Sequence, residues 1–453
     1  MLYTRIMSNK TLVDLDQWLA PHKSTIQARE KYISSKLEKV LINKTPAEFA
    51  MGFLHFGLHK TDTGWTFREL AKNATRMFLV GDFSDWKERE EFALNRDKNG
   101  EWSINLPENS LRHGQKYKLR VYWSDGDGWR LPSYANYVVQ DENSVDFSAV
   151  VWSPKTPYDW QYKTLPKPKV PLIYEAHVGM SSQQEKVASF SEFTADVLPR
   201  IKESGYNTIQ LMAIAEHPYY GSFGYHVSNF FAVSSRFGTP DDFKKLVDTA
   251  HGMGLRVIID LVHAHAAKNE VEGLSNFAGD PTQYFKPTNH PEWDSRLFDY
   301  GKPEVLHFLA SNCRWWLDEY HIDGFRFDGV TSMIYHDHGL GKSFTSYDDY
   351  FRDNVDKDAL AYLRLANETI HSVRPDATTI AEEMSGFPGL GASTKDGGLG
   401  FDYRLQMGAP DLWIKTLKEK NDEDWDLGQL AYTLSSHRPE EKVINYAESH
   451  DQA

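Results

Sequence analysis

Hydrophobic and polar residues follow different patterns in successive parts of this chain. Residues 28–41 (AREKYISSKLEKVL) repeat apolar side chains at helical spacing, which predicts a helical extension over residues 1–47. Residues 48–153 instead carry short runs rich in β-forming residues, and turn signals such as DKNG at 97–100 separate these runs. A segment of about 100 residues with this spacing predicts an all-β sandwich.

Five prolines between residues 154 and 171 mark a second change, and we expect a stiff linker there. From residue 172 onwards, apolar strand candidates alternate with longer amphipathic segments. The strand candidates are residues 172–175, 208–214, 256–262, 324–328, 378–382, 400–403 and 443–448. This alternation predicts an α/β fold with parallel strands and right-handed crossovers, either a (β/α)8-type TIM barrel or an open doubly wound sheet.

Local signals refine this third pattern, the barrel candidate over residues 172–453. Thr239, followed by a proline and two acids, predicts the start of a helix, and residues 303–320 predict another with one buried face. No glycine-rich phosphate loop follows the first strand, which counts against a nucleotide-binding sheet. There are seven strand candidates, and the sequence ends directly after the seventh. We therefore expect a barrel that lacks its last strand and the following β domain, unless the barrel interpretation is itself wrong.

Composition and charge narrow the classes of partner. The chain has 50 Lys and Arg against 64 Asp and Glu, a net charge of −14, which argues against nucleic acid and anionic membrane surfaces. Aromatic residues make up 13% of the chain; their rings suit sugar faces, although they also serve as core. The only cysteine, Cys313, excludes an intrachain disulfide, fits a reducing compartment and is expected to be buried. No apolar run of about 18 residues occurs, so we expect neither a signal peptide nor a membrane span, and a cytoplasmic location.

Charged and imidazole side chains gather at the predicted strand ends, where a barrel of this kind builds its chemistry. They are Asp260 and His265 after the third strand, Arg326 and Asp328 on the fourth, Glu382 at the end of the fifth, and His450 and Asp451 after the seventh. Any one of them alone is more simply explained as a solvated strand end or a structural ion pair. Their occurrence at four strand ends indicates a functional site.

Arg326 and Asp328 are the most informative of these residues. They are two apart, so on a strand both side chains point to the same face. A fixed cation beside a carboxylate lowers its pKa and keeps it ionised, as a carboxylate nucleophile requires. Glu382, at the end of an apolar strand, could keep its proton near neutral pH and act as an acid. Two such carboxyl groups about 5–5.5 Å apart would form a retaining glycosidase centre.

At these segments the sequence resembles the α-amylase superfamily, whose four short motifs occur in order. The matching segments are DLVHAH at 260–265, GFRFD at 324–328, AE at 381–382 and HD at 450–451. The resemblance implies that Asp328 is the nucleophile, that Glu382 is the general acid/base and that Asp451 binds sugar hydroxyls and stabilises the transition state. It also implies a sugar-binding role for further residues, namely Asp260, His265, Arg326, His450 and, as the residue on which the sugar ring stacks, Tyr225.

Longer stretches resemble the branching enzymes of this superfamily more closely than its amylases. Among them are YEAHVGM at 174–180, QLMAIAEH at 210–217 and YAESHDQA at 446–453, while VGDFSDW at 80–86 resembles the carbohydrate-binding module that precedes the barrel in these enzymes. The resemblance implies a retaining glycosyltransferase that cleaves α-1,4-glucan chains and re-attaches them through α-1,6 linkages, as in glycogen or starch branching. Its expected partner is an α-glucan polymer, and we expect a monomer.

Two alternatives remain open beside the branching transferase. One is an α-glucan hydrolase of the same fold, of the amylase or debranching type. The other is a glucan-binding protein that has no catalytic activity. Whether a chain hydroxyl or water resolves the intermediate depends on the shape of the acceptor site, which short motifs do not reveal.

We expect neither a metal ion nor another cofactor. His263 and His265 alternate on the third strand, but no third well-spaced ligand accompanies them. Ala264 stands where many amylases carry an asparagine that helps to hold calcium. A second departure, His226 in place of the glutamine expected in branching enzymes, concerns the donor subsite.

Overall fold

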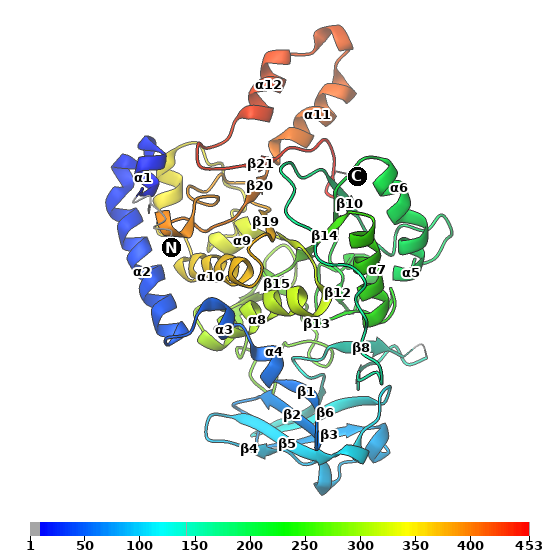
Figure 1. Cartoon of the computed structure of the whole chain (residues 1–453). Coiled ribbons are helices and arrows are strands. Elements are labelled where there is room, and N and C mark those ends of the chain that lie inside the picture. The colour runs from blue at the N-terminus through cyan, green and yellow to red at the C-terminus, as the bar shows by residue number, and fades with distance from the viewer. Residues whose placement is uncertain (1–9, 142, 453) are drawn as a thin grey trace, which may run out of the picture. The chain divides into compact units, whose positions relative to one another are not determined.

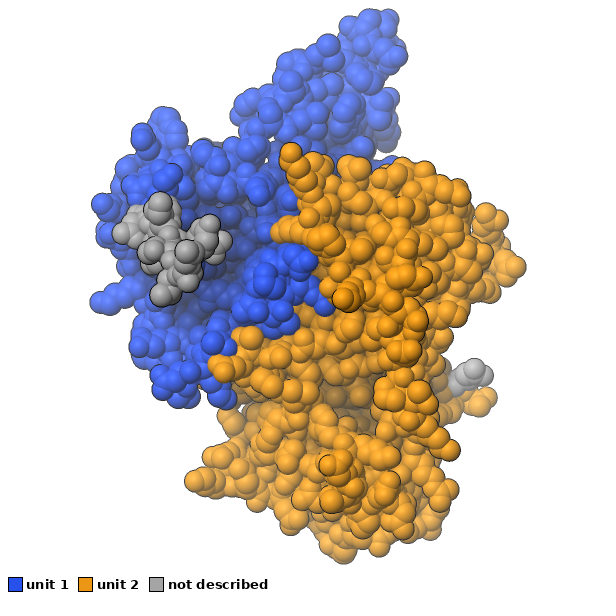
Figure 2. Space-filling model, in the orientation of Figure 1, with its two compact units in different colours: residues 1–46, 325–453 blue, residues 47–324 orange. Residues whose placement is uncertain are grey.

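The computed structural model describes residues 10–141 and 143–452. The chain forms two compact units, which Figure 2 shows in different colours: unit 1 comprises residues 1–46 and 325–453, and unit 2 comprises residues 47–324. Unit 1 therefore joins the helical extension to the second half of the barrel segment. Unit 2 joins the β segment to the first half of the barrel segment. The sequence patterns alone did not indicate this division.

The first part of unit 2 is a β-sandwich, as predicted (Figure 1). One antiparallel sheet has the order β1-β2-β5-β4, with β1 Gly57–Thr61, β2 Gly64–Leu70, β4 Asn95–Arg96 and β5 Glu101–Pro107. The other sheet has the order β12-β13-β8-β9-β6-β3, with β7 beside β6; its strands are β3 Arg76–Gly81, β6 Lys116–Trp123, β7 Gly126–Arg130, β8 Tyr137–Gln140, β9 Phe147–Val150, β12 Ala215–Glu216 and β13 Asn229–Ser234. Alternate side chains on β2 and β5, among them Phe67 and Trp102, are buried and supply core. Because β13 pairs in parallel with β8, the second sheet continues into the part of unit 2 that follows the sandwich.

That second part of unit 2 has the strand–helix alternation predicted from the sequence. The parallel strands β10 (Ile173–Ala176), β11 (Thr208–Leu211) and β14 (Arg256–Leu261) are hydrogen-bonded neighbours. The helices are α5 (Phe190–Glu192), α6 (Leu198–Glu203), α7 (Pro240–Gly252) and α8 (Pro303–Tyr320), and a small sheet holds β15 (His265–Ala266), β16 (Phe285–Asn289) and β17 (Arg296–Phe298). The predicted helix starts are confirmed. Thr239 caps α7, since its hydroxyl accepts from Asp242 N at 3.2 Å and its own N–H donates to Asp242 Oδ2 at 2.9 Å. Cys313 on α8 is fully buried, as predicted.

Unit 1 contains the remaining strands of the series. Their order is β18 (Gly324–Phe327), β19 (Thr378–Ala381), β20 (Tyr403–Leu405) and β21 (Val443–Ile444), and β19, β20 and β21 are parallel. The helices between them are α9 (Val330–Ile334), α10 (Lys357–Val373), α11 (Gly408–Glu419) and α12 (Leu427–Ser435). Together with β10, β11 and β14 of unit 2, these strands bring the strand–helix series to seven strands within the described residues. The sequence predicted the same number. None of the helices within the described residues has both the length and the apolar character needed to span a bilayer.

The last strand is shorter than predicted. The sequence suggests residues 443–448, but only Val443–Ile444 is strand. The cause is the neighbouring strand: Gln406 N donates to Ile444 O, and two residues later the chain turns into α11. Residues 445–448 therefore have no strand beside them on that edge, and Asn445 bonds through its side chain to Leu434 O instead.

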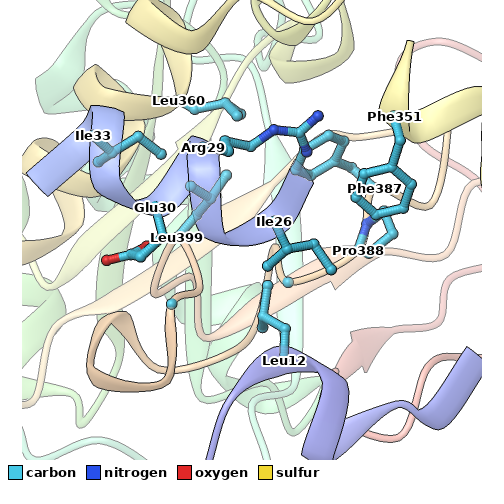
Figure 3. Close-up of a pocket in the computed structure, with 12 residues that line it drawn as sticks. Leu12, Ile26, Arg29, Glu30, Ile33, Phe351, Leu360, Phe387, Pro388 and Leu399 are labelled. Carbon is cyan, nitrogen blue, oxygen red and sulfur yellow. The ribbon is translucent and has the colours of Figure 1, made fainter. Parts of the chain in front are cut away.

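The N-terminal extension is helical over its described residues and packs on α10. It consists of α1 (Leu12–Leu15), η1 (Gln17–His22) and α2 (Lys23–Leu41). Arg364 Nη1 donates to Glu30 Oε1 at 2.8 Å, and a second contact joins the two side chains through Nη2 and Oε2. Figure 3 shows Arg29 of α2 beside the rings of Phe351 and Phe387, whose centroids lie 5.3 Å from its guanidinium carbon. Burial lowers the pKa of Arg29 to about 10, so this cation stays charged near neutral pH.

Candidate active site

Unit 1 brings Arg326 and Asp328 together at the end of β18. Arg326 Nη1 donates to Asp328 Oδ1 at 2.8 Å, and the two side chains are only 2% and 14% exposed. The contact is the one that two-residue spacing on a strand predicts. Gly329 has φ 63°, a left-handed conformation that suits glycine and lets the chain turn into α9 directly after Asp328.

Glu382 lies at the neighbouring strand end, directly after β19. Its backbone is tied to β18 and to the turn after it, since Glu382 N donates to Phe327 O at 3.0 Å and Val330 N donates to Glu382 O at 3.1 Å. The side-chain Oε2 accepts from Gly329 N at 2.7 Å and lies 3.2 Å from Arg326 Nη2. Oε1 has no hydrogen bond within the described part of the chain, so this oxygen is available to a ligand.

One guanidinium group thus contacts both carboxylates through different nitrogens. The planar fork of arginine permits this arrangement, whereas a lysine ammonium is a single point of charge. Glu382 follows an apolar strand, but its side chain has polar neighbours: Gly329 donates its N–H to Oε2, and Arg326 Nη2 lies 3.2 Å from the same oxygen.

Glu383 is a functional candidate that the sequence reasoning missed. Its carboxylate is completely buried and accepts from Ser385 N at 2.7 Å, Gly386 N at 2.8 Å and Phe387 N at 3.0 Å. The available signal was the acidic doublet Glu382-Glu383 at a strand end, followed by a serine and a glycine. Successive side chains of an extended chain point to opposite sides, so the second acid of such a doublet faces inward when the first faces a ligand.

Two of the predicted sugar-binding residues meet in unit 2. Tyr225 Oη donates to Asp260 Oδ2 at 2.6 Å, across 35 positions of sequence. Asp260 lies on β14 and is 4% exposed. The hydrogen bond holds the phenol oxygen of Tyr225 beside Asp260.

His265, on β15 of unit 2, is buried among rings. Its imidazole centroid lies 4.9 Å from Trp293 and 5.7 Å from His226. Burial, together with the charges of His226 and His290, lowers the pKa of His265 to about 3. The imidazole is therefore neutral near pH 7, and it can donate or accept one hydrogen bond to a sugar hydroxyl.

His450 and Asp451 follow β21 in unit 1. His450 Nε2 lies 3.4 Å from Asp451 Oδ1, and the aspartate side chain is 44% exposed. Asp451 N is held by Ser449 Oγ at 3.3 Å. The pair therefore lies in a turn beyond the last strand rather than on the strand itself.

Among the described residues, no group of three histidine, cysteine, aspartate or glutamate side chains is arranged to hold a metal ion. His263, one of the two alternating histidines, bonds through Nε2 to Asn312 Oδ1 at 2.9 Å. This contact gives His263 a structural place in the core of unit 2.

Two known protein families match this chain, one in the β-sandwich segment and one in the barrel segment. The family of carbohydrate-binding module 48 (isoamylase N-terminal domain) matches residues 55–135, and the alpha amylase catalytic domain matches residues 194–291. A solved structure of pullulanase from Bacillus acidopullulyticus covers 87% of this chain with 52% of its own, at a TM-score of 0.65 and 19% identity. The predicted fold class, a β-sandwich before an incomplete (β/α)8-type barrel, is confirmed.

Sequence relatives are more specific. The 1,4-alpha-glucan-branching enzyme of Yarrowia lipolytica is 48% identical over 97% of this chain and 67% of its own length. The enzyme of the same name from Dictyostelium discoideum is 46% identical over 100% of this chain and 68% of its own. That of Solanum tuberosum is 47% identical over 98% of this chain and 54% of its own. The chain spans about two thirds of the first two relatives, and it belongs to the family of 1,4-alpha-glucan-branching enzymes.

Proposed function

We propose that the protein is a 1,4-α-glucan branching enzyme, which cleaves an α-1,4-linked chain and transfers the cleaved segment to a 6-hydroxyl of an α-glucan. One observation carries this proposal beyond family membership. Arg326 holds Asp328 and Glu382 on a single guanidinium group at adjacent strand ends. A retaining double displacement requires two carboxyl groups at one glycosidic bond, one as nucleophile and one as acid and then base.

In the first step Asp328 attacks the anomeric carbon of an internal glucose. The bond from that carbon to the glycosidic oxygen breaks, and Glu382 gives its proton to the departing oxygen through Oε1, the oxygen that carries no hydrogen bond within the described residues. A glycosyl ester on Asp328 results. Arg326 remains beside Asp328, now an ester, and beside Glu382, now a carboxylate whose negative charge it balances.

In the second step Glu382 acts as a base. It takes the proton from a 6-hydroxyl of an acceptor chain, the hydroxyl oxygen bonds to the anomeric carbon, and the ester to Asp328 breaks. Two inversions give net retention, so the new linkage is α-1,6. The remaining predicted residues are proposed to bind the sugar. Tyr225 would stack on it, and His450 and Asp451 would bind its hydroxyl groups. Asp260 would hold the Tyr225 side chain, and His265, beside Trp293, would bind a sugar hydroxyl.

Amylose distinguishes this proposal from its rivals. A branching enzyme lowers the iodine colour of amylose without a matching rise in reducing ends, and subsequent debranching releases short chains. A hydrolase of the same fold gives new reducing ends in proportion to the lost colour. A glucan-binding protein gives neither, although it retains amylose. Asp328→Asn is the control, because it keeps the shape of the site and removes the nucleophile.

A further inference from the structure

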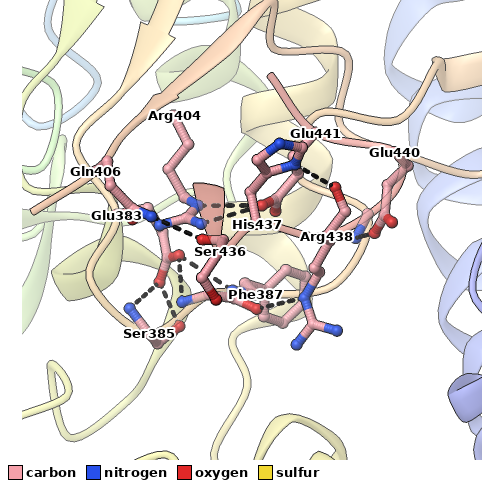
Figure 4. Close-up of polar contacts among 12 residues, drawn as sticks. Glu383, Ser385, Phe387, Arg404, Gln406, Ser436, His437, Arg438, Glu440 and Glu441 are labelled. Atoms are coloured by element: carbon pink, nitrogen blue, oxygen red, sulfur yellow. Dashed lines mark hydrogen bonds and ion pairs between the residues drawn. The ribbon is translucent and has the colours of Figure 1, made fainter. Parts of the chain in front are cut away.

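Glu383 forms a buried carboxylate clamp on the turn that follows the catalytic strand end. Its two oxygens accept from the backbone N–H groups of Ser385, Gly386 and Phe387, and Oε1 also accepts from the Ser385 hydroxyl. Figure 4 shows these contacts converging on the one side chain. Because the group is fully buried and both oxygens are occupied, it cannot itself exchange protons with a substrate.

The clamp is connected to the turn that carries the nucleophile. Thr331 Oγ1 accepts from Met384 N at 2.8 Å and lies 3.5 Å from Glu383 Oε1. Thr331 belongs to α9, which begins directly after Gly329, the residue whose N–H holds Glu382 Oε2. Both acids of the doublet are therefore bound to the same short turn, Glu382 at its first residue and Glu383 two residues later.

The far side of the clamped segment is also fixed. Tyr350 Oη donates to Ser385 O at 2.7 Å, and Arg438 Nε donates to Gly386 O at 2.8 Å. Gly386 has φ 75°, which a residue with a side chain rarely adopts. The segment 383–387 is thus held from both sides, and the Glu383 carboxylate supplies the inner side.

A side chain that accepts hydrogen bonds at two oxygens suits this position. Each contact described for Glu383 comes from an N–H or O–H donor, and a carboxylate is the side chain that accepts at both oxygens and donates at neither. Glutamine has the same length, but its amide NH₂ would face at least one backbone N–H group in either orientation. One substitution therefore removes the clamp with little change in volume.

We propose that Glu383 is a positioning residue for general acid catalysis: by fixing the turn after β19 it holds Glu382 Oε1 at the leaving oxygen. The proposal rests on the proposed function of Glu382. Glu382 keeps its backbone hydrogen bonds to Phe327 and Val330, but loss of the clamp should loosen the chain directly after it. This misplaces the proton donor, while Asp328, on the other strand, keeps its contact with Arg326. The value of kcat/KM should then fall more for reactions whose leaving group needs a proton from Glu382 than for reactions whose leaving group does not.

A pair of donors with different leaving groups measures this difference. Cleavage of amylose needs a proton on the departing oxygen, whereas an α-maltooligosaccharyl fluoride releases fluoride ion with little protonation. In both cases kcat/KM reports formation of the glycosyl ester on Asp328. For Glu383→Gln we expect kcat/KM on amylose to fall about 100-fold, the size of a general acid contribution, and kcat/KM for fluoride release to fall less than about threefold.

The controls separate positioning from simple destabilisation. Glu441→Gln is matched, because Glu441 is another buried carboxylate of unit 1 that pairs with Arg404 and does not contact the 383–387 turn (Figure 4). It should lower both rates equally or neither. If Glu383→Gln fails to fold, Thr331→Val removes one link of the clamp with almost the same volume and should show the same selectivity at smaller amplitude.

Each outcome has one meaning. Equal losses on amylose and the fluoride, or no loss on either, would overturn the positioning role. Glu382→Gln measured in parallel tests the proposed function separately, since it must also lose amylose cleavage selectively. If Glu382→Gln is selective and Glu383→Gln is not, only the inference about Glu383 fails. If Glu382→Gln is not selective, the proposed function fails.

Discussion

Arg326 Nη2 lies 3.2 Å from Glu382 Oε2 while Nη1 of the same group donates to Asp328. The Arg326 guanidinium therefore contacts the proposed acid, Glu382, as well as the proposed nucleophile, Asp328. Sequence spacing linked Arg326 to Asp328 alone, because those residues share a strand. The contact with Glu382 depends on the neighbouring strand and on the turn at Gly329.

Replacing Arg326 by lysine should separate these two contacts. An ammonium keeps the positive charge but cannot reach two carboxylates with fixed geometry. We expect kcat/KM on amylose to fall about 100-fold, comparable to the loss of one oriented donor in other active sites. Arg364→Lys is the matched control, because it loosens a buried arginine of unit 1 that contacts Glu30 instead. A variant with wild-type activity at Arg326 would show that the shared contact is unimportant.

The phenol of Tyr225 should contribute less than its ring. Tyr225→Phe removes the hydrogen bond to Asp260 and keeps the ring, so kcat/KM should fall about tenfold, as for one hydrogen bond to a charged group. Tyr225→Ala removes the ring as well and should raise KM for short maltooligosaccharides further. Tyr219→Phe, on a tyrosine of unit 2 that is 69% exposed, should change neither parameter. Equal effects of the two Tyr225 variants would exclude a stacking role.

Stability should fall as the solution becomes acidic. Burial lowers the pKa of His263 to about 3 and also lowers that of His265 to about 3, against an ordinary value of 6.5. Between pH 3 and pH 6.5 the unfolded chain binds these protons and the folded chain does not, so stability is lost as pH falls through this window.

The slope of the stability curve gives the size of this effect. Each histidine should remove about 1.4 kcal/mol per pH unit below pH 6.5. Urea unfolding of wild type and His263→Gln between pH 7 and pH 4.5 tests the prediction. The variant is less stable at pH 7, because it changes the contact with Asn312, but its curve should be flatter by one proton. An unchanged slope would mean that His263 takes up a proton in the folded protein.

The helical extension should depend on one ion pair. Glu30→Gln weakens the two-point contact with Arg364, which is 4% exposed, and should lower the free energy of unfolding by about 1–3 kcal/mol. Amide exchange in α2 should accelerate in parallel. Glu38→Gln, an exposed position on the same helix, is the control and should change neither measurement. If both variants behave alike, the ion pair does not anchor the extension.

The sequence predicted the features that are coded locally. Thr239 marks the start of α7, and the predicted helix over residues 303–320 coincides with α8, because caps and apolar periodicity are properties of neighbouring residues. It did not predict that residues 10–46 join the later half of the chain. That union rests on contacts such as Glu30 with Arg364, 334 positions apart, which no periodicity records.

The candidate site shows the same division. Arg326 and Asp328 follow from alternation along one strand, and family motifs identify Glu382. The sequence did not indicate Glu383, because a buried acid and an exposed one are the same letter in a sequence. The proposed positioning role of Glu383 depends on three backbone N–H groups that the following turn directs at its carboxylate. These contacts depend on the conformation of that turn, which the left-handed Gly386 sets in part and which the sequence does not show.

Trapping the glycosyl-enzyme tests the central claim most directly. Glu382→Gln can form the ester with an α-maltooligosaccharyl fluoride, but it lacks the base that transfers the sugar onward, so the ester should accumulate. Intact mass should rise by one maltooligosaccharyl group per chain, and peptide mapping should place that group on Asp328. Asp328→Asn in the same background should gain no mass. A label on any other carboxylate, or unlabelled protein after fluoride release, would contradict Asp328 as the nucleophile.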